Sequence, residues 1–380
     1  MNERAWEYVI VGGGIYGVAT AWHMASAGAE VLVLEGRTVA SGASGGLGER
    51  GVRANGRDLR ELPLMRAAYE VWPTLEADLG HPTGWERVGH LRLYERHHDV
   101  GAARARAWAQ GEAGIETYHL DRSGVREIEP GLSDVVLGAL HCPHDGVADH
   151  SATTAGYAAQ ARKAGVAIRE DAVVSAVEMT GGRAATVVLE GGERITVRGD
   201  ILLMNNTGVA PLVAASFGRS LPVWTIFPQA MCTDPVAEPP FRSLFGHAHR
   251  PLALKMLAGG AVMASGGWRG RWNPERGEGE ALPDAVRGNW AEAVRVFPVL
   301  EDLKPKMARA DRAESASVDD IPIIDRLPEA PNVIVGTGWS GHGWAIAPAA
   351  APLIAQWARE GGDAPGPLRP FRLDRFTSRR

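Results

Sequence analysis

Three glycines near the start of the chain have the spacing of a nucleotide-phosphate site. Gly12, Gly14 and Gly17 form the pattern G-x-G-x-x-G, and Glu35 follows about 20 residues later. In such a site the first glycine permits a tight turn, the second lets the backbone approach a pyrophosphate, and the third lets a helix pack closely on a strand. The acid accepts hydrogen bonds from a ribose and disfavours a 2′-phosphate. These residues predict dinucleotide binding.

The segments around the glycines predict the elements that would position them. Residues 8–11 are an apolar run of strand length, residues 18–27 carry apolar residues at helical spacing up to Gly28, and residues 31–34 form a second buried strand. This is a β-α-β unit whose helix N-terminus offers free N–H groups and a positive dipole to phosphates. A glycine-rich turn in a plain α/β fold would leave Glu35 without a role.

The segment after this unit favours FAD over NAD. Residues 37–58 read RTVASGASGGLGERGVRANGRD, a long loop of small residues and arginines. A loop of this length inside a compact domain is usually functional. Its small residues would admit a large flat ligand, and Arg50, Arg53 and Arg57 would supply positive charge near it.

A second glycine-rich turn lies near the C-terminus. A strand at 332–335 leads into a turn at 336–343, which holds four closely spaced glycines, and an apolar helix follows at about 345–358. The backbone N–H groups and the helix dipole there would stabilise the negative charge that a reduced flavin carries. His342 lies in this turn, either hydrogen-bonded to backbone or in contact with the flavin.

The middle of the chain alternates between two kinds of segment. Asp149 or Ser151 is expected to cap a helix ending at Gly165, and short strands and glycine turns follow up to the buried strand in DILLMNNTG. Residues near 82–140 and 220–315 are instead rich in Trp, Pro and Arg. We expect them to form a substrate domain that is inserted in two pieces.

Composition limits the class of protein. The chain has 380 residues, 45% of them hydrophobic, a net charge of −5, and two cysteines, Cys142 and Cys232. Two cysteines are too few for a disulfide framework or a zinc site, so we expect no metal and a reducing, cytoplasmic location. The acidic balance argues against nucleic-acid binding. We expect no signal peptide and no transmembrane segment, because no apolar run reaches the ~18 residues a span needs.

The chain resembles the FAD-dependent amine oxidoreductases of the D-amino-acid oxidase superfamily, nearest to monomeric sarcosine oxidase and glycine oxidase. The resemblance covers nearly the whole chain and rests on VGGGIYG, SGASGG with GERGVR, DGVADH, DILLMNNTG and SVDDIPIIDRLPEAPNVIVGTGWSGHGWAIAP. It implies an α/β fold (α+β overall). A Rossmann-like FAD-binding domain would be built from residues 1–81, 143–219 and 316–380. Residues 82–142 and 220–315 would form a substrate domain with a mixed or antiparallel sheet.

The resemblance also implies an activity. A hydride passes from an amine carbon of a small amine or amino acid (an N-methyl amino acid, a glycine-like compound or a D-amino acid) to flavin N5, and the imine hydrolyses. The electron acceptor would be O₂ or another molecule. The chain would act as a monomer or homo-oligomer, or with a partner subunit.

The family's cofactor positions can be placed on this sequence. They lie in the pyrophosphate loop, at the ribose acid, in the loop around the isoalloxazine, at an adenine contact, at the end of DILLMNNTG and in the turn at the pyrimidine edge. The corresponding residues are Gly12, Gly14, Ile15, Tyr16, Gly17, Glu35, Gly36, Arg37, Ser41, Ala43, Ser44, Gly45, Gly46, Leu47, Val174, Thr207, Gly208, Gly338, Gly341, His342, Gly343, Trp344 and Ala345.

Candidate catalytic residues follow from the same resemblance. Arg50 falls where sarcosine oxidase has an arginine near the flavin, and Arg53 where it has one that holds the substrate carboxylate. A planar guanidinium suits a carboxylate bidentately. A surface ion pair is the alternative role for each arginine. His342 and Glu314 complete the candidate set.

Departures from the family pattern qualify these expectations. The segment ADRAESASVDDIPIID lacks the cysteine to which sarcosine oxidase attaches its flavin, so FAD is expected to be non-covalent. Glu314 stands where related enzymes have a carboxylate-binding arginine, with Arg312 two residues away. Glu314 would either face the cavity and favour a cationic or polar amine, or lie in a charged surface strand. Ala345 replaces a second basic residue.

The last departure concerns oxygen. The oxidases carry a lysine over the flavin that promotes reaction with O₂, and the matching stretch AVMASGGWRGRW has none, while Lys255 lies upstream. This slightly favours a dehydrogenase. Two other functions stay open: oxidation of a 2-hydroxy acid, and a flavoprotein subunit of a multi-chain amine or opine dehydrogenase. Trp268, Trp272 and Trp290 either line the substrate cavity or pack in the core.

Overall fold

The apolar run at the start of the chain forms an inner strand of a six-stranded sheet in the computed structural model, which describes residues 5–44 and 48–377. Neighbouring strands run parallel except β22 and β23. Strands covered on both faces read as continuous apolar runs, which explains the sequence of β1. The sheet order is β22 (Ile323–Leu327), β23 (Ala330–Thr337), β12 (Ile201–Leu203), β1 (Tyr8–Val11), β2 (Val31–Leu34) and β8 (Ala167–Arg169).

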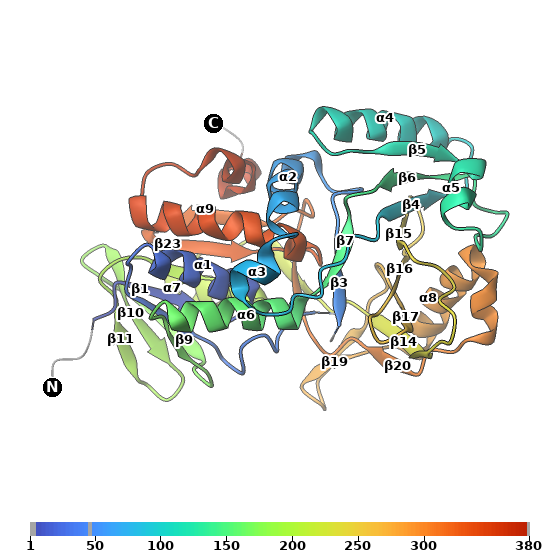
Figure 1. The fold of residues 1–380 in the computed structure, drawn as a ribbon. Coiled ribbons are helices and arrows are strands. Elements are labelled where there is room, and N and C mark those ends of the chain that lie inside the picture. The colour runs from blue at the N-terminus through green and yellow to red at the C-terminus, as the bar shows by residue number, and fades with distance from the viewer. Residues whose placement is uncertain (1–4, 45–47, 378–380) are drawn as a thin grey trace.

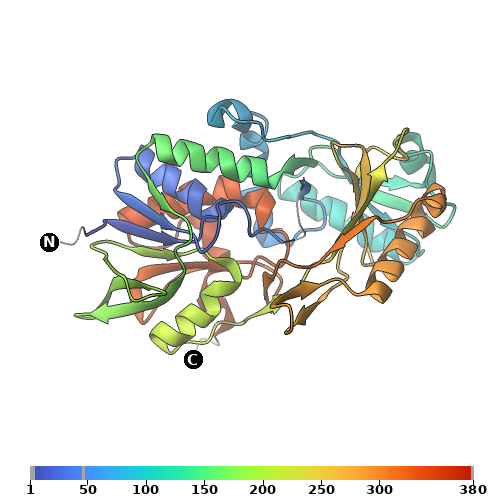
Figure 2. The ribbon, with the colours of Figure 1, turned by 90° about the horizontal axis from the view of Figure 1, so that it is seen from below.

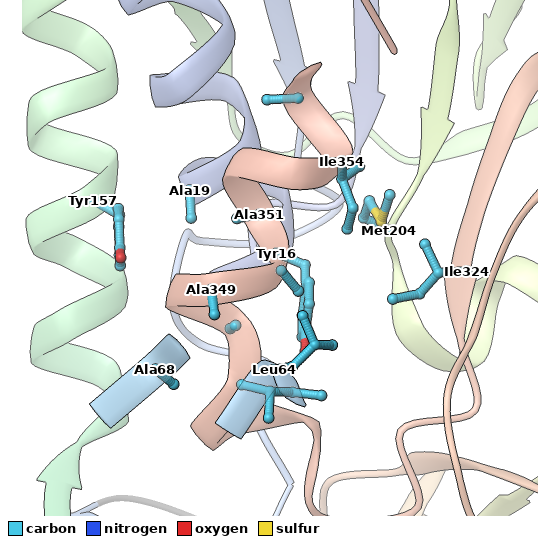
Figure 3. Close-up of a cluster of buried hydrophobic side chains, with 14 of the residues drawn as sticks. Tyr16, Ala19, Leu64, Ala68, Tyr157, Met204, Ile324, Ala349, Ala351 and Ile354 are labelled. Atoms are coloured by element: carbon cyan, nitrogen blue, oxygen red, sulfur yellow. The ribbon is translucent and has the colours of Figure 1, made fainter. Parts of the chain in front are cut away.

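Different layers cover the two faces of this sheet (Figures 1 and 2). One face carries the helices α1 (Ile15–Ser26), α6 (His150–Lys163) and α9 (Ala347–Glu360), with α2 (Leu62–Val71) and α3 (Leu75–Leu79) beside them. Figure 3 shows part of this core, where Tyr16, Ala351 and Ile354 lie among small and aliphatic side chains. The other face carries the antiparallel strands β9 (Val174–Thr180), β10 (Arg183–Leu189) and β11 (Arg194–Thr196) and the helix α7 (Val209–Phe217).

A second lobe is built on an eight-stranded mixed sheet. Only its β15–β4 pair is parallel. The order is β20 (Met307–Arg309), β14 (Ala230–Pro235), β17 (Ala261–Ser265), β16 (Ala253–Met256), β15 (Leu244–His247), β4 (His90–Tyr94), β6 (Gly138–Cys142) and β5 (Tyr118–Asp121). The helices here are α4 (Asp99–Glu112), α5 (Arg122–Ile128) and α8 (Pro283–Val296).

Three short ribbons complete the strands. They are β3 (Glu49–Val52) with β7 (Gly146–Asp149), β13 (Val223–Ile226) with β21 (Glu314–Ser317), and β18 (Arg271–Asn273) with β19 (Glu278–Glu280). In Figure 1, β3 and β7 lie between the two lobes. The 3₁₀ helices are η1 (Leu59–Glu61), η2 (Asn206–Gly208), η3 (Pro298–Asp302), η4 (Gly343–Ile346), η5 (Gly366–Phe371) and η6 (Leu373–Phe376).

The expected fold class is confirmed, and most expected elements are present. The strands at 8–11 and 31–34 have the expected bounds, and Asp149 caps α6 by accepting a hydrogen bond from Ala152 N at 2.9 Å. The helix α1 begins at Ile15, earlier than the expected 18. The domain limits stay a prediction. No helix within residues 5–44 and 48–377 has both the length and the apolar content to cross a bilayer.

The segment 37–58 is the main difference, because it is not all loop. Its second half contains β3, whose sequence ERGV has no strand-like alternation. Pairing with β7, which is distant in sequence, supplies the hydrogen bonds that this segment needs to be extended. Among the three tryptophans, Trp290 is buried in the core of the second lobe and Trp272 is exposed.

Candidate functional site

The turn between β1 and α1 is shaped as a phosphate cradle. Gly12 has φ +110°, and a Cβ added there would lie 2.7 Å from the carbonyl oxygen of Met204. A Cβ on Gly17 would overlap the carbonyl oxygen of Gly12. At Gly14, by contrast, an added Cβ meets no described atom within 4 Å, and no side chain caps the helix that starts there. The first amides of α1 are therefore available to an anion.

The first turn of α1 contacts the C-terminal turn. The Tyr16 ring stacks on Trp339 with centroids 3.7 Å apart, and its hydroxyl donates to the Gly343 carbonyl at 2.6 Å. Ile15 packs against the same helical core. Two of the sequence-predicted cofactor segments, more than 300 residues apart, therefore meet through Tyr16.

The predicted ribose acid lies at the end of β2. Glu35 accepts a hydrogen bond from Gly13 N at 2.6 Å and another from Arg37 N at 2.9 Å. Its own carbonyl accepts from Ala172 N, so the strand entering Val174 lies beside Gly36. The structure thus brings the predicted ribose and adenine positions together at the same end of the sheet.

The loop predicted to surround the isoalloxazine approaches β21. Ser44 donates to Glu314 Oε2 at 2.5 Å, and the Ala43 carbonyl lies 3.5 Å from the guanidinium of Arg312. The buried hydroxyl of Ser41 has no hydrogen-bond partner among the described residues. Gly45, Gly46 and Leu47 lie outside the residues that the structure describes.

Glu314 is an interior carboxyl, not a surface acid. It is 7% exposed, and burial raises its pKa to about 7 although hydrogen bonds from Ser44 and from the Gly341 amide oppose the rise. Asn206, in the 3₁₀ helix that also holds Thr207 and Gly208, accepts from Ser315 N at 3.0 Å. The end of DILLMNNTG therefore lies next to the same carboxyl-bearing strand.

The C-terminal turn meets the N-terminus of α9 through η4. Gly338 and Gly341 have φ of +71° and +80°, conformations that suit glycine. A Cβ on Gly341 would meet no described atom within 4 Å. The buried Trp344 Nε1 has no hydrogen-bond partner among the described residues, and the Ala345 carbonyl accepts from Trp72 Nε1 at 2.9 Å. The turn thus has open space beside Gly341, and the buried Trp344 Nε1 is a donor that no described residue uses.

Arg50 on β3 belongs to a positively charged group of side chains. It lies 4.0 Å from the sulfur of Met263, and burial lowers its pKa to about 10. Burial also lowers the pKa of His150 to about 3, helped by the charges of Arg50 and Arg312. This region favours a negatively charged or electron-rich ligand.

A lysine joins this group from an unexpected strand. The stretch AVMASGGWRGRW forms β17 and the residues after it, and Met263 of β17 pairs directly with Lys255 of β16. Lys255 is 6% exposed, and burial together with the charge of Arg50 lowers its pKa to about 7. The stretch AVMASGGWRGRW lacks a lysine, but the neighbouring strand β16 places Lys255 near Arg50.

Arg53 lies near the acids Asp145 and Glu61 but is not paired with either of them. Its guanidinium donates to the Asn55 carbonyl at 2.8 Å, and it forms no ion pair within residues 5–44 and 48–377. Burial, followed by the charge of Arg57, lowers its pKa to about 10, so it stays cationic at neutral pH. The surface ion pair that was the alternative for Arg53 is not seen. The N–H groups of Arg53 that no described residue accepts from could bind an anionic ligand.

Arg57 is the arginine whose charge is neutralised internally. It donates to Glu61 Oε1 at 2.8 Å and to the His342 carbonyl at 2.5 Å. Burial would raise the pKa of Glu61, but Arg57 and the His342 ring outweigh it and lower that pKa. The His342 Nδ1 lies 3.3 Å from Glu61 Oε1, so the ring is held by protein groups.

Sequence reasoning did not propose a site role for three of these residues. Glu61, Lys255 and Asp145 are all buried and charged, which is rare without a partner or a function. Asp145 accepts from the amides of Ala54 and Asn55 at 2.6 and 3.1 Å. The sequence signal that could have identified Asp145 is its place in the motif DGVADH. Glu61 is four residues after Arg57, a helical ion-pair spacing, whereas Lys255 gave no local signal.

The residues present fit FAD. The cradle at Gly14 suits a pyrophosphate, the unpartnered Ser41 and Trp344 atoms offer hydrogen bonds, and the cationic region around Arg50 suits the negative charge of a reduced flavin. FAD would supply a two-electron acceptor at this place.

Comparisons with known proteins agree with this fit. The family model described as DAO, FAD dependent oxidoreductase, matches residues 7–357. The sarcosine oxidase subunit beta of Rhizobium meliloti is 28% identical over 98% of this chain and 88% of that protein. The L-proline dehydrogenase of P. horikoshii has a similar fold, with a TM-score of 0.87, 23% identity and coverage of 98% and 99%. For the glycine oxidase of Geobacillus kaustophilus the TM-score is 0.86, with 20% identity and coverage of 98% and 100%.

Proposed function

The chain belongs to the family of FAD-dependent oxidoreductases, and we propose that it oxidises the C–N bond of a small amino acid, with FAD held non-covalently. The observation that carries the substrate class is Arg53. Its partly buried guanidinium has no acidic partner among the described residues and lies in the segment that Arg57 ties to the His342 turn. A substrate carboxylate would supply the missing negative charge through two parallel hydrogen bonds.

The proposed site would also prepare the amine. An ammonium nitrogen has no lone pair to assist the departure of a hydride, so the amine must lose its proton first. The positive charges of Arg50 and Arg53 and a desolvated site would lower the substrate's amine pKa. We assign no side chain as the general base.

Glu314 has a different proposed role from the one its position first indicated. Its Oε2 accepts the short hydrogen bond of Ser44, so the carboxyl is engaged inside the protein. We propose that it orders the loop at Ser44 against the turn at Gly341, and that carboxylate binding rests on Arg53. The Arg312 guanidinium lies 3.5 Å from the Ala43 carbonyl of the same loop.

Lys255 supports O₂ as the electron acceptor. A cationic lysine beside Arg50 would stabilise negative charge that develops on oxygen, which favours an oxidase over the dehydrogenase that the sequence alone slightly favoured. The relative from Rhizobium meliloti is named a subunit, and this supports a second proposal, that the chain works with a partner chain. Native mass measurement of the protein from its source tests that proposal: a mass above that of homo-oligomers would support it.

One anaerobic experiment tests the main proposal. The purified protein is denatured with acid to ask whether its yellow colour is released, and the native protein is then mixed with glycine, N-methylglycine, proline, D-alanine and 2-hydroxy acids without air. Released colour and bleaching by an amino acid support the proposal. Bleaching by hydroxy acids alone would replace it with C–O oxidation, and a protein that takes up no FAD would overturn it. Readmitting air distinguishes an oxidase from a dehydrogenase.

A further inference from the structure

The guanidinium of Arg57 joins three segments at once. Its Nε donates to the Arg53 carbonyl at 2.5 Å, its Nη1 to Glu61 Oε1 at 2.8 Å, and its Nη2 to the His342 carbonyl at 2.5 Å. Arg57 is 3% exposed and Glu61 is fully buried. Every nitrogen of this side chain therefore makes a hydrogen bond inside the protein.

We propose that Arg57 is a positioning residue that sets the place of Arg53 relative to the turn at His342. This inference rests on the proposed function, in which Arg53 holds the substrate carboxylate and the turn borders FAD. In this proposal Arg57 contacts neither the substrate nor FAD, because it acts through the backbone carbonyls of Arg53 and His342.

The neighbouring hydrogen bonds show why the connection is rigid. The Asp145 carboxylate accepts hydrogen bonds from the amides of Ala54 and Asn55, the two residues after Arg53. Arg57 donates to the Arg53 carbonyl, so the backbone on this stretch is held at both its amides and its carbonyl. At the other end, the His342 amide donates to the Trp339 carbonyl at 3.0 Å. A change at Arg57 would therefore move two anchored segments relative to each other.

Only arginine can make this three-way contact. Its planar fork presents donors in fixed directions, whereas a lysine ammonium is a single point that cannot reach two carbonyls and a carboxylate in this arrangement. Glu61 supplies the negative charge without which a buried guanidinium would be costly. Arg57→Lys therefore keeps the positive charge and removes the three-way hydrogen bonding.

The test compares Arg57→Lys with Arg60→Lys. Arg60 lies three residues later, is exposed and pairs with Asp58 and Asp319, so its variant controls for loss of an arginine in the same segment. Each protein is titrated with FAD by flavin fluorescence, and the FAD-bound protein is titrated with acetate, a simple carboxylate, by its visible spectrum. We expect Arg57→Lys to raise the Kd of acetate about 10-fold or more and that of FAD about 5-fold, with Arg60→Lys within about 2-fold of wild type.

A second readout needs no FAD. Hydrogen exchange of the FAD-free proteins is followed in the peptides that cover 53–57 and 339–344. We expect Arg57→Lys to accelerate exchange about 10-fold in both peptides together, while peptides in β9–β11 stay unchanged. Unchanged exchange and unchanged acetate binding would overturn the inference. Failure of the wild type to bind FAD would instead overturn the proposed function, and a variant that does not fold is replaced by Glu61→Gln in the same two measurements.

Discussion

Ser44 and Glu314, which are 270 residues apart in sequence, are joined by a hydrogen bond of 2.5 Å from the serine hydroxyl to the buried carboxylate. The bond connects the loop after the first β-α-β unit to β21, the strand that leads into the C-terminal half of the nucleotide-binding sheet. The buried carboxyl of Glu314 is therefore engaged by a group of the protein itself. At this position, where related enzymes are expected to have a carboxylate-binding arginine, this chain has a buried carboxyl that is hydrogen-bonded to Ser44.

The burial of Glu314 predicts a pH dependence of stability, because burial raises the pKa of this carboxyl against the opposing hydrogen bond from Ser44. The pKa of Glu314 is raised to about 7 in the folded protein, against about 4.3 for an ordinary Glu. Its contribution to stability is therefore fully present below about pH 4.3 and is lost as pH rises through 7, up to about 4 kcal/mol. Relative to wild type, Glu314→Gln should become progressively more stable from pH 5 to pH 8.

The measurement is the thermal unfolding of FAD-free wild type and FAD-free Glu314→Gln from pH 5 to pH 8. Glu329→Gln, at an exposed acid paired with Arg219, is the control and should show no such trend. A difference between Glu314→Gln and wild type that stays constant with pH would contradict the prediction.

The two glycines of the phosphate turn should separate binding from folding. A Cβ on Gly14 meets only open space, so Gly14→Ala should lower the Tm of the FAD-free protein by no more than about 2 °C while raising the Kd of FAD at least about 10-fold. A Cβ on Gly17 overlaps the Gly12 carbonyl, so Gly17→Ala should cost about 2–4 kcal/mol of stability. Denaturation and FAD titration of both variants decide this, and equal FAD affinity in Gly14→Ala and wild type would speak against phosphate binding there.

Arg53 should control recognition of the carboxylate. Removing a bidentate partner leaves the substrate's charge unpaired, so Arg53→Ala should lower kcat/KM for an amino acid by about 100-fold, or about 2.7 kcal/mol. The loss should appear mainly in KM, and a simple amine without a carboxylate should change by less than about 3-fold. Steady-state kinetics with both compounds, and Arg60→Ala as the control, provide the test. An equal loss for both compounds would assign Arg53 a structural role.

Lys255 should govern the reaction with oxygen and not the reaction with substrate. Without its charge beside Arg50, the rate constant for O₂ should fall about 100-fold in Lys255→Met, while anaerobic reduction by an amino acid stays within about 3-fold. Stopped-flow spectroscopy separates the two half-reactions. If both rate constants stay at wild-type values, Lys255 does not promote the reaction of the reduced flavin with O₂.

The sequence by itself determined the nucleotide-binding unit and the fold class. The turn at Gly12, Gly14 and Gly17 needs glycine for local steric reasons, and buried strands such as Tyr8–Val11 have a continuous apolar pattern, so each can be read within a short window. Asp149 was likewise identifiable as a helix cap from its immediate neighbours.

The tertiary structure alone decided how the charged residues are used. Three arginines of the segment 37–58 are used differently. Arg57 is neutralised by Glu61 and bonded to the His342 carbonyl, while Arg53 has no ion pair among the described residues. Arg50 on β3 contacts Met263, which pairs with Lys255. Burial and partner choice set these differences, and both depend on segments that are far apart in the chain. A local pattern cannot contain them, because the energy of a buried charge is determined by which distant groups fold around it.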